Sequence, residues 1–358
     1  MTSRDNKTHD VANKATTGLT AKTNPYVLAL GMVGAALRQV STWFFSTFYL
    51  LIVRSTMALV LSLVLTITPV FWPQELDSKA GSEVDDLTPG LDSALPIPCH
   101  SHNDYWRQTP LHSAILAGCV GVEADVWAVQ GELYVGHNLG SLSTDRSLSS
   151  MYIQPLVELL QNKNSVDYPT LPPRGVYDRE PSQTLVLLVD LKSDPDIAWS
   201  LLLEKLEPLR QRGWLSHVSN STFVSRPITV VGTGETEIRM VDEDTPTRDV
   251  FLDAPLAELD EGIYSTLNSY YASVSFEETI GAVGRSGLQP TQLAKLRDHI
   301  AKAHGRGLKV RYWGMPYWPI DVRNQLWDTL LDEGVDMLNV DDLVEARNVY
   351  AKRGRLVK

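Results

Sequence analysis

The alternation of polar and apolar residues divides the chain into segments of different character. Residues 1–42 begin with a polar stretch that has no apolar periodicity, which is typical of a disordered tail. Residues 43–72 are almost continuously apolar, and residues 73–95 are acidic and rich in Gly, Pro and Ser. From residue 96 to about residue 350, short β-branched runs alternate with helical patterns. We therefore expect a tail, an apolar segment, a linker and one folded α/β domain.

The apolar segment has the features of a membrane anchor. After Arg54 it runs for 18 residues without a charge, at the lower limit of what spans a bilayer. Aromatic residues stand at both ends, in Trp43–Phe45 and Phe71–Trp72, as they do at membrane interfaces. A buried core helix is the alternative, and a cleaved signal peptide would begin nearer the N-terminus. We expect residues 43–72 to hold the protein in a membrane.

Charge on either side of the anchor predicts its orientation. Residues 1–72 carry a net charge of +4, whereas residues 73–95 carry −5. The positive-inside rule then places the N-terminus in the cytosol and the folded domain on the extracytosolic side. The charge pattern does not distinguish the secretory pathway from the mitochondrion as the location of the anchor. In the first case Asn220-Ser221-Thr222 is a usable N-glycosylation sequence.

The folded domain has the size and rhythm of a (β/α)8 TIM barrel. Eight runs are predicted as strands, with helical patterns such as residues 194–213 and 289–307 between them. A doubly wound open sheet is the alternative, but it would need a Gly-rich first loop, which is absent. The predicted strands are Ile97–His100, Val120–Trp127, Leu185–Asp190, Ile228–Val231, Val250–Leu252, Ala272–Val274, Lys309–Tyr312 and Met337–Val340.

Composition narrows the class of partner. Apolar residues make up 43% of the chain and charged residues 21%, which is ordinary for a globular protein with a sizeable core. The net charge of −11 argues against a nucleic-acid partner, because phosphate backbones require a basic surface. A small phosphate-bearing substrate is compatible with this negative net charge if a divalent cation supplies positive charge at the site. Cys99 and Cys119 could form one bridge, but two buried thiols are the favoured interpretation.

Polar side chains capable of chemistry follow the ends of several predicted strands. His100 and His102 come at the first strand, and Glu123 and Asp125 at the second, each pair spaced so that both side chains share one face. Chemistry in TIM barrels lies where the strands end. Further candidates at strand ends are His137, Asp190, Lys192, Arg311 and Trp313.

Three of these candidates are carboxylates: Glu123, Asp125 and Asp190. Gathered at one rim without a matching cluster of cations, they would repel one another unless they bound a cation. Ligation by oxygen alone suits Mg²⁺ or Ca²⁺. The sequence therefore predicts one divalent metal site, with Mg²⁺ preferred over Ca²⁺.

Several motifs resemble a known group of enzymes. "HSHNDYW", "PLHSAILAGCVGVEADVW", "GELYVGH", "SLSSMYIQPL", "YWGMPYWP" and "MLNVDDL" occur between about residues 96 and 350. They resemble the phospholipase-C-like phosphodiesterase superfamily, which includes glycerophosphodiester phosphodiesterases and sphingomyelinases D. The similarity is greater to the fungal altered inheritance of mitochondria protein 6 family.

The resemblance implies roles for most of the candidates. It implies that Glu123, Asp125 and Asp190 hold the metal, and that His137 and one of His100 and His102 serve as general acid and base. It also implies that Lys192 contacts phosphate and that Trp313 lies near the substrate; Arg311, at the end of the same strand, is the third candidate for substrate binding. The His-Arg-Gly and Glu-Asn patterns of glycerophosphodiesterases are absent, so specificity for glycerophosphodiesters stays open.

Position along the first strand distinguishes its two histidines. Asn103-Asp104 is a turn-forming pair that marks where the chain leaves the barrel, so His102 should stand at the rim. His100 should lie one layer deeper, where it would orient its neighbours through hydrogen bonds. We expect His102 to act with His137 in catalysis.

These features predict a metal-dependent phosphoric diester hydrolase that acts on a phospholipid- or glycerophosphodiester-like substrate. C-type and D-type cleavage both stay open. One alternative is a membrane-tethered lipid-binding barrel without activity. Another is a metal-dependent amidohydrolase, but its further histidine ligands should follow the fifth and sixth strands. The remaining histidines fall elsewhere: His9, His112, His217, His299 and His304.

Overall fold

The computed structural model of the protein describes Arg54, Thr56 and residues 94–164, 172–242 and 248–354. Nearly all of the predicted tail, anchor and linker thus lies outside the described residues, and these assignments stay predictions. Among the residues that are described, no helix is both long enough and apolar enough to cross a membrane.

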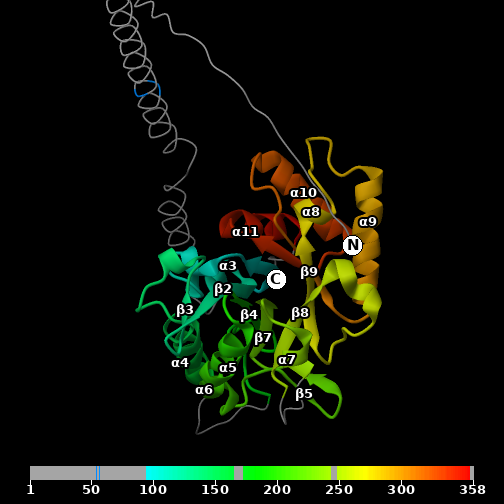
Figure 1. The fold of residues 1–358 in the computed structure, drawn as a ribbon. Helices are drawn as coiled ribbons and strands as arrows, with labels where there is room; N and C mark the ends of the chain where they lie inside the picture. The colour runs from blue at the N-terminus through cyan, green and yellow to red at the C-terminus, as the bar shows by residue number, and fades with distance from the viewer. Residues whose placement is uncertain (1–53, 55, 57–93, 165–171, 243–247, 355–358) are drawn as a thin grey trace, which may run out of the picture. The chain divides into compact units, whose positions relative to one another are not determined.

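Eight parallel strands close into a barrel, as the sequence predicts (Figure 1). Going round the barrel, the strands follow the order β1, β11, β10, β9, β8, β7, β4, β2, and pairing of β1 with β2 completes the ring. This closure excludes the doubly wound open sheet. The barrel strands are β1 (Ile97–Ser101), β2 (Cys119–Val129), β4 (Leu185–Leu191), β7 (Ile228–Gly234), β8 (Val250–Pro255), β9 (Ser269–Ser275), β10 (Lys309–Trp313) and β11 (Met337–Val340).

The strands are apolar on both faces because one face lines the barrel interior and the other packs against helices. β4, with the sequence "LVLLVDL", is buried along almost its entire length, as expected for a strand of a covered parallel sheet. β2 continues beyond its barrel partners because its end pairs with the antiparallel strand β3 (Glu132–Val135). Gln130 and Gly131 connect the two strands with positive φ angles, which matches a two-residue hairpin turn.

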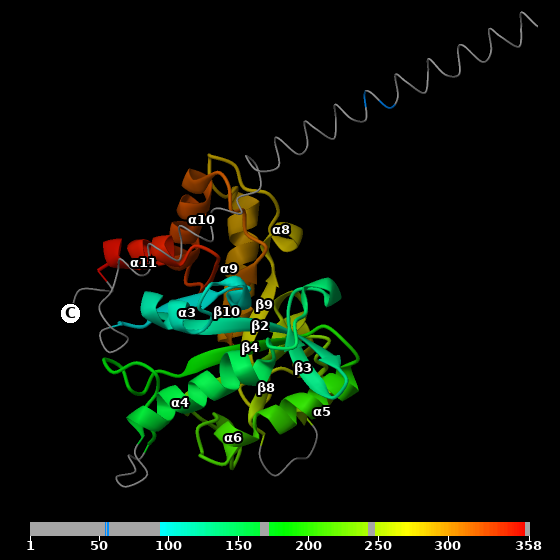
Figure 2. The same ribbon diagram turned by 90° about the vertical axis from the view of Figure 1, so that its left-hand side faces the viewer.

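Helices surround the barrel, with α4, α5 and α6 on one side and α9, α10 and α11 on the other (Figure 2). Their ends follow sequence signals: the Asp194 side chain accepts a hydrogen bond from the Ile197 backbone to cap α5, and α9 stops at Gly305. The helices are α3 (His112–Ala117), α4 (Gln154–Lys163), α5 (Pro195–Lys205), α6 (Glu207–Arg210), α7 (Ile238–Asp242), α8 (Phe276–Thr279), α9 (Pro290–His304), α10 (Ile320–Glu333) and α11 (Leu343–Lys352).

Shorter elements complete the domain. The antiparallel hairpin of β5 (His217–Ser219) and β6 (Thr222–Val224) precedes β7. Short helical segments occupy several of the loops: η2 (Asp104–Trp106), η3 (Leu139–Ser141), η4 (Ser149–Ile153) and η5 (Leu256–Glu261).

Cys99 and Cys119 form a disulfide, so the expectation of two buried thiols was wrong. The two residues lie on β1 and β2, neighbouring strands in the closed barrel, and their Cα atoms are 4.6 Å apart. Both cysteines are fully buried. The bridge therefore ties together the two strands at which the barrel closes.

Candidate active site

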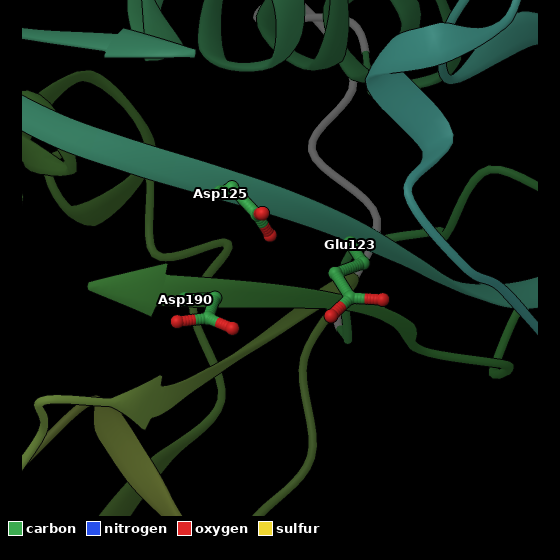
Figure 3. Close-up of side chains that lie close together, drawn as sticks. All are labelled: Glu123, Asp125 and Asp190. Carbon is green, nitrogen blue, oxygen red and sulfur yellow. The ribbon is translucent and has the colours of Figure 1, made fainter. Parts of the chain in front are cut away.

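Three carboxylates converge at the carboxyl ends of β2 and β4 (Figure 3). Glu123 and Asp125 are two residues apart on β2 and share one face, and Asp125 lies directly opposite Asp190 of β4. One oxygen from each of the three lies within 4.8 Å of the others. The structure therefore brings together all three residues predicted as metal ligands.

Lys192 supplies the nearest positive charge to this cluster. Its Nζ lies 2.6 Å from Asp190 Oδ2 and 3.5 Å from Asp125 Oδ2. Desolvation, together with the neighbouring carboxylates, raises the pKa of Asp125 and of Asp190 above the ordinary value, although Lys192 opposes the rise. Arg311 also acts on Glu123 and Asp190, but Asp253 already pairs with its guanidinium, so negative charge remains in excess.

The donor atoms of the cluster fit a hard divalent cation. Asp125 Oδ1 and Asp190 Oδ1 are both buried and have no hydrogen-bond partner within the described part of the chain. Burying such oxygens without a partner is costly, and a cation would satisfy both of them. Gly234 leaves the space that Asp190 needs, since a Cβ atom there would lie 2.0 Å from Asp190 Oδ1. The residues present are thus suited to Mg²⁺ or Ca²⁺.

His102 stands at the rim beside this cluster, at the position predicted for it. Its Nε2 lies 4.0 Å from Glu123 Oε2, and its Nδ1 lies 2.8 Å from Asp341 Oδ1, beyond the end of β11. Desolvation would lower the pKa of His102, but the hydrogen bond to Asp341 and the charges of Glu123 and Asp341 outweigh it and raise the pKa. Asp341 thus both orients the imidazole and makes it more basic.

The loop that carries His102 is fixed by a buried aspartate. Asp104 accepts hydrogen bonds from Ser101 Oγ at 2.7 Å and from the backbone N–H of Leu111 at 2.6 Å. Tyr152 Oη adds a third contact, 3.1 Å from Asp104 Oδ2. Asn103 takes a left-handed backbone conformation, as the predicted turn requires. The turn residues thus hold in place the part of the rim that carries His102.

His137 contacts the other acid of the β2 pair. Its Nδ1 lies 3.1 Å from Asp125 Oδ2, while its ring is half exposed. The Tyr105 hydroxyl lies 2.8 Å from the same Asp125 oxygen, and the Trp106 ring lies with its centroid 5.3 Å from that of His137. Both predicted histidines therefore touch the carboxylate cluster, each through a different carboxylate.

His100 lies deeper in the barrel, as predicted, and it is fully buried. Neither ring nitrogen has a hydrogen-bond partner among the residues that the structure describes, so the expectation that His100 orients its neighbours through hydrogen bonds was wrong. Its ring packs edge-on against Tyr271 and fills the space beside Gly121, where a Cβ atom would lie 2.3 Å from Nδ1. Burial, followed by the charges of Arg311 and His102, holds the pKa of His100 well below its ordinary value.

The predicted substrate-binding residues of β10 differ in their surroundings. Arg311 is only 2% exposed, and it donates hydrogen bonds to Asp253, Ser273 and Asn339 inside the barrel. These partners already engage its guanidinium, so a contact with the substrate stays a prediction. Trp313, at the end of the strand, is 41% exposed. Lys192 is the predicted substrate ligand that lies against the carboxylates.

The sequence analysis missed three residues that complete the site: Asp341, Tyr105 and Asp253. Asp341 follows β11 in the same way that Asp190 ends β4, so the strand-end rule could have found it. Tyr105 sits in the motif that carries His102, but nothing in the sequence indicates its contact with Asp125. Asp253 pairs with Arg311 across the barrel interior, which only the closed fold reveals.

The remaining described histidines do not reach the cluster, which removes the support for an amidohydrolase. His112 begins α3, and His217 lies on the β5–β6 hairpin. His299 in α9 pairs with the Tyr312 hydroxyl, and His304 pairs with Asp336. The group found among the described residues that could hold a metal consists of carboxylates alone.

Comparisons with known proteins agree with this geometry. Residues 90–253 match the model of the AIM6-like phosphodiesterase domain. An altered inheritance of mitochondria protein 6 homolog of Arthroderma benhamiae is 40% identical over 74% of this chain and 86% of its own. Altered inheritance of mitochondria protein 6 of Eremothecium gossypii is 39% identical over 68% of this chain and 67% of its own. In Saccharomyces cerevisiae the protein of that name is 33% identical over 76% of both chains.

Among solved structures, a glycerophosphodiester phosphodiesterase from Parabacteroides distasonis aligns with 74% of this chain and 100% of its own, at 13% identity and a TM-score of 0.40. The barrel assignment rests on the strand pairing and not on this alignment. Together, the closed barrel, the carboxylate site and the domain match define a protein of the phosphodiesterase superfamily. Within it, the chain belongs to the altered inheritance of mitochondria protein 6 family.

Proposed function

We propose that the protein is a divalent-metal-dependent phosphoric diester hydrolase. The observation that carries the proposal is the contact of two histidines with one carboxylate cluster: His102 lies against Glu123, and His137 lies against Asp125. Cleavage of a phosphodiester requires neutralisation of the phosphate charge, removal of a proton from the nucleophile and protonation of the leaving oxygen. The site offers a group for each of these tasks.

Glu123, Asp125 and Asp190 would hold the metal, with Mg²⁺ preferred to Ca²⁺. When bound, the ion supplies positive charge to the non-bridging oxygens of the phosphate. Lys192 adds a second positive charge at the same place, since its ammonium already lies against Asp190 and Asp125. If the three carboxylates held the metal, Lys192 would be released from them and could contact the phosphate.

The histidines move the protons. Asp341 accepts a hydrogen bond from Nδ1–H of His102, which leaves Nε2 available to take the proton of the attacking hydroxyl. His137 donates a proton to the leaving oxygen from the ring nitrogen that does not face Asp125. In this scheme the general base is His102, whose pKa is raised by its neighbours.

Exposed aromatic residues near the site favour a lipid-derived substrate. Trp106 follows β1 and touches His137, while Trp313 ends β10 and Tyr317 and Trp318 follow it. Tyr317 is 76% exposed and Trp318 is 67% exposed. Large aromatic side chains with a polar tip favour the interface between water and lipid. They would bring the site to a phosphodiester at a membrane surface.

A substrate panel tests the proposal directly. The full chain, purified in detergent, is incubated with sphingomyelin, lysophosphatidylcholine, phosphatidylinositol and glycerophosphocholine, with Mg²⁺ or with a chelator. We expect turnover of at least one lipid that Mg²⁺ supports and the chelator abolishes. Release of a phosphorylated headgroup indicates C-type cleavage, and release of the free headgroup indicates D-type cleavage. Equal turnover with and without chelator would contradict the metal requirement, and no turnover of any substrate would favour a binding protein without activity.

A further inference from the structure

The sequence Asn220-Ser221-Thr222 forms the tip of the β5–β6 hairpin. Asn220 and Ser221 are the two turn residues, with φ angles of 49° and 55°, and they join Ser219 to Thr222. All four residues are exposed. Asparagine tolerates this left-handed conformation better than most residues do. The hairpin therefore presents the Asn220 side chain to solvent.

The hairpin lies away from the catalytic rim. It precedes β7 at the start of that strand, whereas Asp190 lies toward the carboxyl end of β4 and His102 follows the carboxyl end of β1. Ser221 and Thr222 line a cavity together with residues at the starts of the barrel strands, among them Pro96, Thr184 and Lys309. A bulky group attached to Asn220 would thus leave access to the catalytic site open.

The side chain of Asn220 is also chemically available. The hydrogen bond described at the turn runs from Thr222 Oγ1 to the backbone carbonyl oxygen of Asn220, at 3.4 Å, and does not involve the Asn220 amide. Asn-x-Thr is the acceptor sequence for N-linked glycosylation. Exposure matters because a sugar attached to a buried asparagine would prevent folding.

An independent observation indicates the compartment. The Cys99–Cys119 disulfide is buried between β1 and β2, far in sequence from the hairpin. Disulfides persist in oxidising compartments such as the lumen of the secretory pathway and are rare in the cytosol. In the lumen of the secretory pathway, the exposed acceptor sequence would meet the glycosylating enzyme.

We propose that the barrel lies in the lumen of the secretory pathway and carries an N-linked glycan on Asn220. In this modification Nδ2 of Asn220 forms a bond to the first sugar of a lipid-pyrophosphate-linked oligosaccharide. The bond between that sugar and the pyrophosphate breaks, the amide loses one proton and the lipid pyrophosphate leaves. The proposal does not depend on the phosphodiesterase activity.

A second acceptor sequence provides an internal control. Asn6-Lys7-Thr8 stands before the predicted anchor at residues 43–72, and Asn220 stands after it. If the N-terminus lies in the cytosol, as the charge distribution predicts, then Asn6 never meets the glycosylating enzyme. Only one of the two asparagines should carry a sugar.

The test is expression of the full chain in a fungal host, followed by digestion with peptide N-glycosidase. We expect the wild-type chain to lose the mass of one glycan on digestion. Asn220→Asp, which keeps a residue tolerant of the turn conformation, should show no glycan, and neither should Thr222→Ala. Thr222→Ser should keep the glycan because serine also completes the acceptor sequence, and Asn6→Gln should keep it as well.

Thiol labelling completes the experiment. A maleimide reagent of high mass, added to the denatured chain, should react with Cys99 and Cys119 only after reduction. A wild-type chain of unchanged mass after digestion would overturn the proposal, even with the disulfide present, because Asn220 would then carry no N-linked glycan. Loss of the glycan in Asn6→Gln alone would overturn the orientation. Free thiols before reduction would likewise contradict a lumenal location.

Discussion

The His102 imidazole and the Asp341 carboxylate form a hydrogen-bonded pair, with Nδ1 2.8 Å from Oδ1, although 239 residues separate them in sequence. The pair is possible because β1 and β11 are neighbours in the closed barrel and Ser101 lies directly opposite Val340. Each partner therefore leaves its strand at the same level of the rim. The proposed role of His102 as general base therefore depends on the first and last strands meeting.

Loss of this pair should slow the reaction and change its dependence on pH. Asp341→Asn removes the negative charge that helps to raise the pKa of His102, so the pKa should fall. A base is inactive below its pKa, and the acidic limb of the pH–rate profile should therefore move to lower pH. We expect turnover at the optimum to drop by about 10–100-fold, since the orientation of the base is also lost. Steady-state kinetics across the pH range measure both effects.

The neighbouring residue Asp342 offers a matched control for this variant. Its side chain caps α11 through the backbone N–H of Glu345 and pairs with Arg323 at 3.0 Å. Asp342→Ala should cost about 1 kcal/mol of stability through loss of the cap, with little change in the pH profile. If Asp342→Ala and Asp341→Asn change the profile equally, then a general loss of negative charge, and not the pair, is responsible.

The predictability of the site from sequence depends on how far apart the interacting residues lie. Glu123 and Asp125 share a face because alternate residues of a strand do, and the strand-end rule adds Asp190. These relations are local or follow from the barrel class. Two partners of Arg311, Ser273 and Asn339, lie on the adjacent strands β9 and β11. Its third partner, Asp253, lies on β8, two strands away. No sequence period specifies such a contact.

The disulfide is a second contact that the sequence does not specify, although its two residues lie closer together in the sequence. Cys99 and Cys119 are separated by 20 residues, and α3 lies between them. The prediction of a barrel already makes the first two strands neighbours, so proximity could have been inferred. The two sulfur atoms can meet only if the strand register places both cysteines at the same height in the sheet. The hydrophobic pattern does not specify this register, because both strands are buried on both faces.

Metal binding should stabilise the folded protein. Saturating Mg²⁺ should raise the free energy of unfolding by roughly 2–4 kcal/mol if binding is tight, because the ion binds only the folded state. Asp125→Asn removes one ligand charge from the cluster and should abolish this gain. Thermal unfolding followed with and without Mg²⁺ gives the measurement.

An aspartate close to the cluster, but outside it, distinguishes ligation from general electrostatic attraction. Asp194 caps α5 shortly after β4, and Asp194→Asn keeps a capping side chain while removing the charge. This variant should retain the full stabilisation by Mg²⁺. An unchanged melting curve of the wild-type protein on addition of Mg²⁺ would rule out the site.

The exposed aromatic residues of the β10–α10 loop should matter for lipid substrates only. Tyr317→Ala should weaken binding to phospholipid vesicles by about fivefold to tenfold, since one large side chain would no longer enter the interface. Turnover of a short-chain, water-soluble phosphodiester should stay unchanged. Ile263→Ser, at an exposed apolar residue that follows η5, is the control and should leave vesicle binding intact. Equal effects of both variants would show that surface hydrophobicity in general governs binding.

His100 of β1 and His102, which follows that strand, should respond to substitution in opposite ways. His102 is partly exposed at the rim, so His102→Ala should lower turnover by at least about 10²-fold while metal binding and stability are retained. His137→Ala should have a similar effect. The double variant should be little slower than either single variant, because the two groups act on one reaction step.

His100→Ala should instead lose mainly stability. Its ring is fully buried against Tyr271 and Gly121, so truncation leaves a cavity that should cost about 2–4 kcal/mol. Turnover per folded molecule, measured well below the melting temperature, should remain near that of the wild type, because His100 is buried beneath the catalytic rim. Chemical denaturation and active-fraction kinetics separate the two quantities. A stable His100→Ala protein without turnover, beside a fully active His102→Ala protein, would reverse the assignment of the pair.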